Sequence, residues 1–375
     1  MAKDVLIILI RQEYENANHK YLWDSLIDSF DGEIVLIGIP ADYIVSIIRN
    51  KRFRIDDHKK GIQKIKEHLY YYRPLSFIRP ELMTNVGVRL YTNRMLNYIC
   101  RQLSIDGEIY CISYEPYWII GLAGRKKVTT AYYLTDEYRL NTDGTEISKR
   151  FTRKDRLATK TANAIFAASS EILNNRKSEY KNGIIMGNGN RTEYVQADQE
   201  GMQDVGLIGN IRDWIDKDLL ENLIRSNTDL TFGLVGNIEK NMESYIDHIL
   251  ETYGNVTYYG KVKKELVDKC YGRFRVIIVP YLINNKFIYA TRPLKIAESI
   301  CAGTRVVSVP VSGYCENEFL IFATSIKDFS EAIRLSISRG RIDITSSAYK
   351  EFKQQNNWET ISKKIVKELK DSRNE

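Results

Sequence analysis

The sequence lacks the short motifs that mark the commonest metal and cofactor sites. It has no C-x-x-C pair, and its five scattered cysteines are Cys100, Cys111, Cys270, Cys301 and Cys315. Such a set favours reduced thiols over a disulfide framework or a zinc site. No G-x-G-x-x-G is present, so the fingerprint of dinucleotide-binding enzymes is missing. No D-x-D pair stands at a predicted strand end. We therefore expect no cofactor and no metal, with Lys, Arg and helix N-termini in place of Mg²⁺.

Long apolar runs are also missing. A helix that spans a bilayer needs about 20 consecutive apolar residues, and no run approaches that length. The run at residues 5–10 is short and leads into Arg11, so we predict a strand there rather than a signal peptide. We therefore expect the chain to be cytoplasmic. With 375 residues, 43% of them apolar, the chain is large enough for two domains with separate cores.

Apolar runs and helical patterns alternate along residues 1–190. Continuous apolar runs are typical of parallel strands covered on both faces, and they occur at 5–10, 34–39, 108–112, 128–134, 164–168 and 183–186. Helical patterns lie between several of them, for example at 85–103. This alternation predicts an α/β fold with a doubly wound sheet. Several strands end in polar loops, which should meet at one sheet edge, where open α/β sheets bind ligands.

A second alternation begins after residues 191–203, which are polar and unpatterned and are predicted to be an interdomain linker. Apolar runs at 230–235, 255–259 and 276–279 continue it. An amphipathic helix is expected within 356–375. The sequence thus predicts two Rossmann-like domains, 1–190 and 204–355, followed by a C-terminal helix.

Residues 291–310, TRPLKIAESICAGTRVVSVP, read as a loop, a helix, a Gly turn and a buried strand. Lys295 and Glu298 are three residues apart and share one helix face. The Lys suits a phosphate and the carboxylate suits sugar hydroxyls, so the pair fits a ligand with both groups. The alternative is a solvated ion pair on an ordinary helix. Gly209 suits a diphosphate if it begins a helix that continues through Arg212. The alternative is that Gly209 is only a turn between a strand and a helix.

The spacing of Pro293, Lys295, Glu298, Gly303 and Val306 resembles the donor-site segment of GT-B glycosyltransferases with a group 1-like C-terminal domain. VGLIGNIRDWIDKDLL, FGLVGN, NVTYYGKV and VIIVPY precede it in the family's order. The resemblance implies two Rossmann-like domains facing across a cleft, a terminal helix that crosses back to the first domain, and a nucleotide-sugar donor. The donor-binding residues it implies are Gly209, Asn210, Arg212, Gly236, Lys261, Val262, Tyr281, Pro293, Lys295 and Glu298. Ala290 stands where many retaining members carry a second Glu, which leaves the stereochemistry open.

The first domain is expected to hold the acceptor and the catalytic base. Inverting transfer needs a carboxylate or a His to take the acceptor's proton. Asp136, in YYLTDEY, is similar to the Asp of a Y-x-x-D-D/E segment in bacterial polysaccharide glycosyltransferases, with Glu137 as its rival; the alternative is that Asp136 caps a turn. His19 is a further candidate for the base or an acceptor contact, unless it only begins a helix. Tyr114 and Glu115, after another strand, are candidate acceptor contacts.

Residues 49–80 combine basic and aromatic side chains, in RNKRFRIDDHKK and YYYRPLSFIRP. One interpretation is a solvated face with local packing. The other is a surface for an anionic membrane, where Tyr and Arg lie at the interface. Such residues also suit single-stranded nucleic acid, but no fold for nucleic-acid recognition is visible, so no nucleic-acid partner is expected.

These observations predict a hexosyltransferase-like glycosyltransferase of cell-surface polysaccharide synthesis, cytoplasmic and peripheral on the inner face of the membrane. It would move a sugar from a nucleotide-diphosphate-sugar to a lipid-linked glycan acceptor. Two alternatives stay open. One is a nucleotide-sugar epimerase of the same fold, and the other is a non-catalytic nucleotide-sugar-binding protein.

Overall fold

The computed structural model describes residues 2–10, 20–43, 53–197, 201–263 and 266–373. The chain divides into two compact units. The first comprises Met1–Arg139, Ile147–Met186 and Trp358–Glu375, and the second comprises Leu140–Glu146 and Gly187–Asn357. The last helix therefore belongs to the first unit, although it follows the second unit in the sequence. The assignment of 140–146 to the second unit had no counterpart in the sequence pattern.

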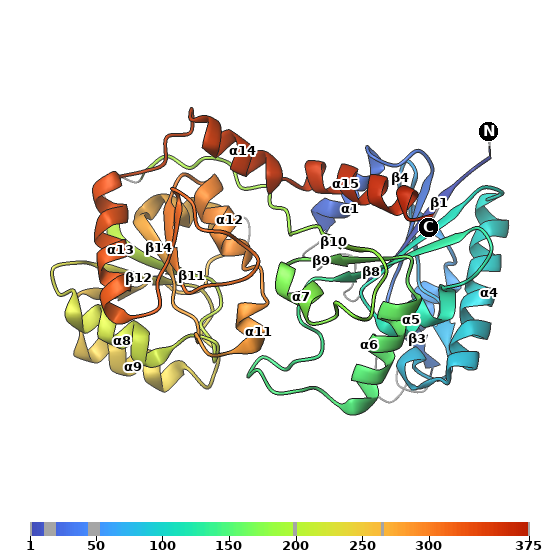
Figure 1. Cartoon of the computed structure of the whole chain (residues 1–375), viewed down its shortest axis with the longest axis horizontal. Coiled ribbons are helices and arrows are strands. Elements are labelled where there is room, and N and C mark those ends of the chain that lie inside the picture. The colour runs from blue at the N-terminus through green and yellow to red at the C-terminus, as the bar shows by residue number, and fades with distance from the viewer. Residues whose placement is uncertain (1, 11–19, 44–52, 198–200, 264–265, 374–375) are drawn as a thin grey trace. The chain divides into compact units, whose positions relative to one another are not determined.

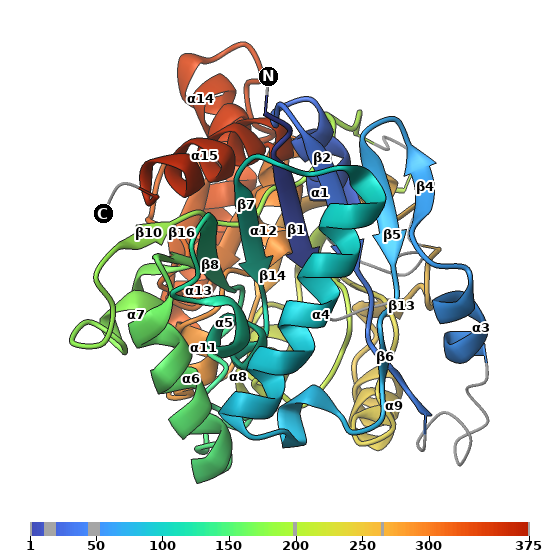
Figure 2. The same ribbon diagram turned by 90° about the vertical axis from the view of Figure 1, so that its right-hand side faces the viewer.

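The first unit is built on a sheet of eight strands among the described residues, in the order β10-β9-β8-β7-β1-β2-β5-β4 (Figure 2). Neighbouring strands are parallel except β4 and β5, which are antiparallel. The strands are β1 (Val5–Leu9), β2 (Glu33–Ile37), β4 (Gln63–Lys66), β5 (Leu69–Tyr72), β7 (Ile109–Ser113), β8 (Val128–Leu134), β9 (Ala164–Ala167) and β10 (Gly183–Ile185), with β3 (Ala41–Asp42) and β6 (Leu75–Ser76) paired separately.

Helices cover both faces of this sheet. Leu6 and Ile8 of β1 pack with α1 (Lys20–Ile27) and α15 (Trp358–Asp371) on one face, and Val5, Ile7 and Leu9 pack with α4 (Asn85–Leu103) and α5 (Pro116–Leu122) on the other. A strand buried on both sides needs an unbroken apolar run, which explains the sequence of β1. The helices of the unit are α1 (Lys20–Ile27), α3 (Phe53–Lys59), η2 (Pro80–Leu82), α4 (Asn85–Leu103), α5 (Pro116–Leu122), α6 (Lys149–Thr161), α7 (Ser170–Asn174) and α15 (Trp358–Asp371) (Figure 1).

The aromatic and basic stretch at 70–80 divides into two parts, because residues 71–76 are mostly buried whereas Phe77 and Ile78 are exposed. Tyr71 and Tyr72 are buried in β5, and Arg73 is buried with its guanidinium beside Asp57 and donating to the carbonyl of Ile39. Of the two interpretations, local packing therefore holds for Tyr71, Tyr72 and Arg73. Residues 49–52 lie outside the described residues.

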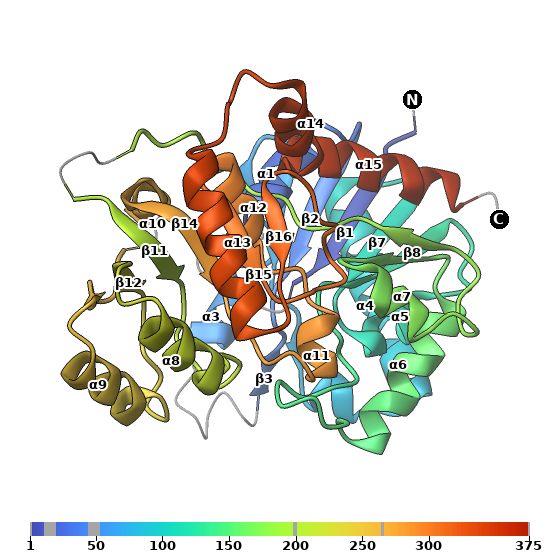
Figure 3. The same ribbon diagram turned by 60° about the vertical axis from the view of Figure 1, so that its left-hand side comes forward.

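The second unit contains a six-stranded parallel sheet in its described part, in the order β13-β12-β11-β14-β15-β16. The strands are β11 (Gln203–Ile208), β12 (Phe232–Val235), β13 (Val256–Tyr258), β14 (Phe274–Val279), β15 (Arg305–Ser308) and β16 (Leu320–Phe322). The helices are α8 (Lys217–Ser226), α9 (Glu243–Thr252), α10 (Val267–Cys270), η4 (Tyr271–Arg273), α11 (Lys286–Tyr289), α12 (Leu294–Cys301), α13 (Ile326–Arg339) and α14 (Ser347–Gln355). Figure 3 shows α12 and α13 beside β15, with which both are in contact.

Both units are therefore α/β domains with doubly wound sheets, which confirms the predicted fold class. In the ranges that the structure covers, we find no helix with the length and apolar character that crossing a bilayer requires.

Candidate functional site

The second sheet changes direction of winding between β11 and β14, and two glycines mark the carboxyl edge beside this point. Gly209 and Gly236 follow β11 and β12 with φ of 117° and 140°. A Cβ on Gly236 would collide with the carbonyl oxygen of Gly209. The two backbones therefore pack against each other with no room for side chains, as occurs where a ligand approaches the main chain closely.

Lys295 reaches this glycine turn from the first turn of α12. A Cβ built on Gly209 would lie 3.1 Å from Lys295 Nζ, and Nζ lies 5.1 Å from the ring centroid of Tyr281, which follows β14. The ring face holds the ammonium in place by a cation–π interaction. Three predicted donor residues, Gly209, Tyr281 and Lys295, are thus brought together.

Glu298 lies one turn after Lys295, and its orientation is set by a residue that the sequence did not reveal. Tyr271 donates its hydroxyl to Glu298 Oε2 at 2.8 Å and is itself 1% exposed. Burial and the neighbouring carboxylate raise the pKa of Tyr271 well above its usual value, so the phenol stays a donor. Tyr271 is 27 residues away in the chain, and no local spacing connects the two.

The segment after Gly209 differs from the expectation. Residues 210–212 are not helical, because Ile211 pairs with Ile238 as an extended bridge and α8 begins only at Lys217, where Asp216 caps it. The prediction that a helix dipole stands behind Gly209 was therefore wrong. The helix that begins beside this turn is α12, whose N-cap is the predicted Pro293.

The other predicted donor residues lie in varied surroundings. Arg212 stacks on Trp214 at 4.1 Å and pairs with Asp213 and Glu239, so its guanidinium is already occupied by two carboxylates. Asn210 and Lys261 are exposed. Val262 packs against the apolar core of the unit.

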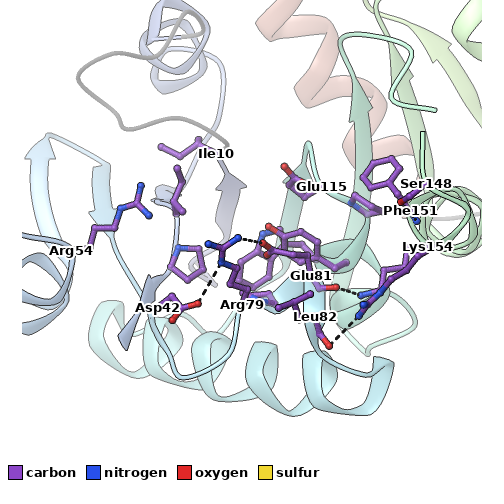
Figure 4. A pocket seen from close by; sticks show the side chains of 17 residues that line it. Ile10, Asp42, Arg54, Arg79, Glu81, Leu82, Glu115, Ser148, Phe151 and Lys154 are labelled. Carbon is purple, nitrogen blue, oxygen red and sulfur yellow. Dashed lines mark hydrogen bonds and ion pairs between the residues drawn. The ribbon is translucent and has the colours of Figure 1, made fainter. Parts of the chain in front are cut away.

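The first unit has a cavity of about 520 Å³ at the carboxyl ends of its strands. Ile10, Ile39 and Glu115 line it, directly after β1, β2 and β7 (Figure 4). In the strand order, winding changes direction between β7 and β1, so the cavity lies where open α/β sheets bind ligands. Its charged lining residues are Asp42, Arg54, Arg79, Glu81, Glu115, Arg150 and Lys154.

Tyr114 and Glu115, the two predicted acceptor contacts after β7, face opposite sides of the chain. Glu115 is the N-cap of α5 and lines the cavity, and its side chain makes no capping hydrogen bond. Tyr114 points the other way, into the core, where it is 4% exposed and stacks on Tyr133 with ring centroids 5.4 Å apart. Successive side chains of an extended segment face opposite sides, and the prediction that Tyr114 contacts an acceptor was therefore wrong.

Asp136 and Glu137 follow β8, the strand next to β7. Asp136 is half-buried. Glu137 is 1% exposed and is paired with the buried Arg176 at 2.7 Å, and the amide of Asn175 also donates to it. A carboxylate held in this way is structural, so Glu137 is removed as a candidate base. His19 lies outside the described residues.

A buried charge network anchors this loop and was not foreseen. Arg176 joins Glu137 to Asp155, and Arg139 joins Asp155 to Glu179. Burial alone would lower the pKa of Arg176, but Asp155 and Glu137 outweigh it and raise the pKa above its usual value. Across the described ranges, no three His, Cys, Asp or Glu side chains gather as a metal site would require.

One family model and several solved structures are similar to this chain. Residues 213–338 match the family described as "Glycosyl transferases group 1". No curated protein matches the chain.

Several solved structures share the fold over nearly the whole chain. A glycosyltransferase from Rickettsia africae is 10% identical with a TM-score of 0.64, covering 99% of this chain and 98% of its own. HepE from Anabaena, solved with UDP and glucose, is 12% identical with a TM-score of 0.62, covering 99% and 100%. The lipopolysaccharide outer core galactosyltransferase WaaB is 12% identical with a TM-score of 0.63, covering 99% of both chains. Residues 213–338 therefore form a group 1 glycosyltransferase domain, and the whole chain shares the fold of these solved glycosyltransferases.

Proposed function

We propose that the second unit binds a nucleoside diphosphate-sugar and that the sugar passes to a hydroxyl of a glycan bound by the first unit. The observation that carries the donor assignment is the convergence of Gly209, Tyr281 and Lys295 at one edge of the second sheet, with Glu298 one turn further along the same helix. The presence of UDP in the HepE structure supports a nucleotide of this class.

The chemistry follows from these groups. As the sugar leaves, negative charge builds up on the diphosphate, and the Lys295 ammonium stabilises it as a point charge together with backbone N–H groups of the Gly209 turn. Glu298 accepts hydrogen bonds from hydroxyls of the sugar or the ribose, and Tyr271 fixes its orientation. In this proposal lysine and main-chain dipoles do the work of a divalent cation.

Asp136 is proposed as the base that takes the acceptor's proton. It follows the strand next to β7, and neighbouring strands lie about 4.8 Å apart, so its backbone is close to the cavity's Glu115 end. The buried pair of Glu137 and Arg176 fixes the adjacent backbone. Glu115 is proposed to hydrogen-bond acceptor hydroxyls.

The acceptor is proposed to be a lipid-linked glycan of the cell surface, which would place the protein peripherally on the membrane. The likeness to WaaB supports this class. A cavity with both carboxylates and guanidinium groups also suits a polar sugar better than an apolar molecule.

The donor assignment is tested by thermal shift with UDP-, GDP-, ADP- and CMP-sugars. A ligand at 100 times its dissociation constant stabilises the protein by about 2.7 kcal/mol. One nucleotide class should raise the Tm of the wild type and not that of Glu298→Ala. Glu331→Ala, an exposed carboxylate on α13, is the control and should respond like the wild type. Equal shifts in all three proteins would refute the site.

The base assignment is tested with Asp136→Asn. Loss of a general base typically costs 10²–10⁴-fold in rate, so transfer should fall by about that factor while the donor-induced Tm shift stays. Glu115→Gln should mainly raise the KM for the acceptor. Consumption of donor without any glycan acceptor would instead indicate an epimerase, and full transfer by Asp136→Asn would exclude this base.

A further inference from the structure

The most exposed large apolar side chains of the described residues are concentrated in one short stretch of the first unit. They are Phe77 (66% exposed), Ile78 (56%), Leu82 (54%), Val86 (68%) and Leu90 (61%), and no other such side chain in the described ranges exceeds 44%. We call these five residues the η2–α4 surface. Single exposed apolar residues are ordinary, but a contiguous group marks a site of interaction.

The way α4 packs explains why this group faces outward. Val88, Thr92 and Met95 lie on the buried side of α4, toward the sheet. Val86 and Leu90 are four residues apart and share the opposite side. The apolar residues on that side are therefore not needed for the core of the unit.

Basic side chains surround the η2–α4 surface. α4 carries three Arg and no acidic residue, and α6 carries six Lys or Arg with Asp155 as its one acid, which is buried. A hollow of about 360 Å³ between the two helices is lined by Asn85, Lys149, Arg150, Arg153, Lys154 and Leu157. The exposed charge beside the apolar group is thus mainly positive, and the one exposed acid of η2, Glu81, is paired with Arg79.

Two hydrogen bonds tie this basic face to the apolar group. Arg150 donates to the carbonyl of Leu82 at 3.3 Å, and Lys154 donates to the carbonyl of Glu81 at 2.6 Å (Figure 4). Burial and the charge of Arg150 lower the pKa of Lys154. The N-terminal turns of α6 and the η2 loop therefore form one continuous surface.

We propose that the η2–α4 surface and the basic face of α6 dock onto a bilayer that contains anionic lipids. Apolar side chains next to Lys and Arg match the two layers of such a bilayer, with the apolar groups entering the acyl boundary and the cations meeting the headgroup phosphates. Nucleic acid would match the positive charge, but its bases stack on aromatic side chains, whereas Val86 and Leu90 are aliphatic. A second copy of the chain would bring positive charge against positive charge.

The docking surface borders the first unit's cavity. Arg79, Leu82, Arg150 and Lys154 line that cavity and belong to the same loop and helix. A bilayer at this face would place a lipid-linked acceptor beside the cavity mouth, a consequence that rests on the proposed function. The docking itself does not depend on the reaction.

The test is sedimentation of the full chain with vesicles of phosphatidylcholine, alone or mixed with phosphatidylglycerol. We expect binding only to the mixed vesicles and its loss in 1 M salt, where the Debye length is about 3 Å. Lys149→Glu/Arg153→Glu should weaken the partition coefficient about twentyfold or more. Val86→Ser/Leu90→Ser should weaken it about tenfold or more.

Matched controls come from α13 in the second unit. Leu335→Ser and Lys327→Glu remove an exposed apolar group and reverse an exposed charge, and both should bind vesicles like the wild type. Unchanged Tm and unchanged donor-induced shifts show that the variants are folded and keep this result separate from the fate of the proposed function. Equal vesicle binding by all variants would overturn the proposal. Absence of vesicle binding would also overturn it. If light scattering then shows a dimer that Leu90→Ser separates, the surface is an interface between two copies of the chain instead.

Discussion

The hydrogen bond from Tyr271 to Glu298 gives the sharpest test of the donor site. Tyr271→Phe removes one oxygen and keeps the buried ring, so the packing of β14 and α12 is preserved. A hydrogen bond to a charged group contributes about 1.5–3 kcal/mol. We expect a stability loss toward the lower end, because the Glu298 carboxylate is half-buried and gains water. Because the Glu298 carboxylate is then no longer held in one orientation, nucleotide-sugar binding should weaken about tenfold.

The assay compares two ligands. Isothermal titration with the nucleotide-sugar should show the weaker affinity, whereas inorganic diphosphate, which needs Lys295 rather than Glu298, should bind Tyr271→Phe as it binds the wild type. The matched control is Tyr349→Phe, because Tyr349 is also a buried phenol of the second unit and donates to the uncharged carbonyl of Cys301 at 2.6 Å. It should lose stability and keep both affinities. If the two variants bind the nucleotide-sugar equally well, Tyr271 does not position Glu298 for the donor.

Three further predictions concern the framework. Gly236→Ala should cost about 3 kcal/mol or more in chemical unfolding, because its φ is 140° and its Cβ has no room, whereas Gly254→Ala, which has nothing within 4 Å, should be nearly neutral. Arg176→Met removes the arginine that pairs with the buried Glu137, leaves Asp155 with Arg139 alone, and should cost about 3–5 kcal/mol, against less than about 1 kcal/mol for the half-exposed Arg156→Met. Burial raises the pKa of Glu179, but hydrogen bonds from two arginines outweigh burial and lower it below its ordinary value of 4.5. Its stabilising contribution is therefore complete above pH 4.5 and is lost as the pH falls through the lowered pKa, so Glu179→Gln should flatten the acid limb of a stability–pH curve; an unchanged limb would contradict this.

The sequence specified the parallel strands well because burial on both faces demands unbroken apolar runs. Residues 128–134 were predicted as a strand and form β8, and residues 85–103 form α4. Strands with a polar side were missed, as in β4, whose residues Gln63–Lys66 alternate between exposed and partly exposed positions.

The site was predictable only where its residues are local in sequence. Lys295 and Glu298 share a helix, so spacing alone put them on one face. Tyr271 and Arg176 act across 27 and 39 residues, and contacts of that kind leave no trace in a single sequence. The sequence also did not show which way each side chain points. Tyr114 and Glu115 are adjacent, yet Tyr114 enters the core and Glu115 lines the cavity.

The placement of α15 has a consequence for biosynthesis. Trp358, Ile365 and Leu369 share a core cluster with Leu6 of β1, so the first unit contains residues from both ends of the chain. A ribosome adds about 5–20 residues per second, so about 9–37 s separate the synthesis of Met186 from that of Leu369. During that interval the apolar face that α15 will cover is open to solvent. The first domain to be made is thus the last to be completed, and a nascent chain of this protein should be a client for chaperones until its final helix emerges.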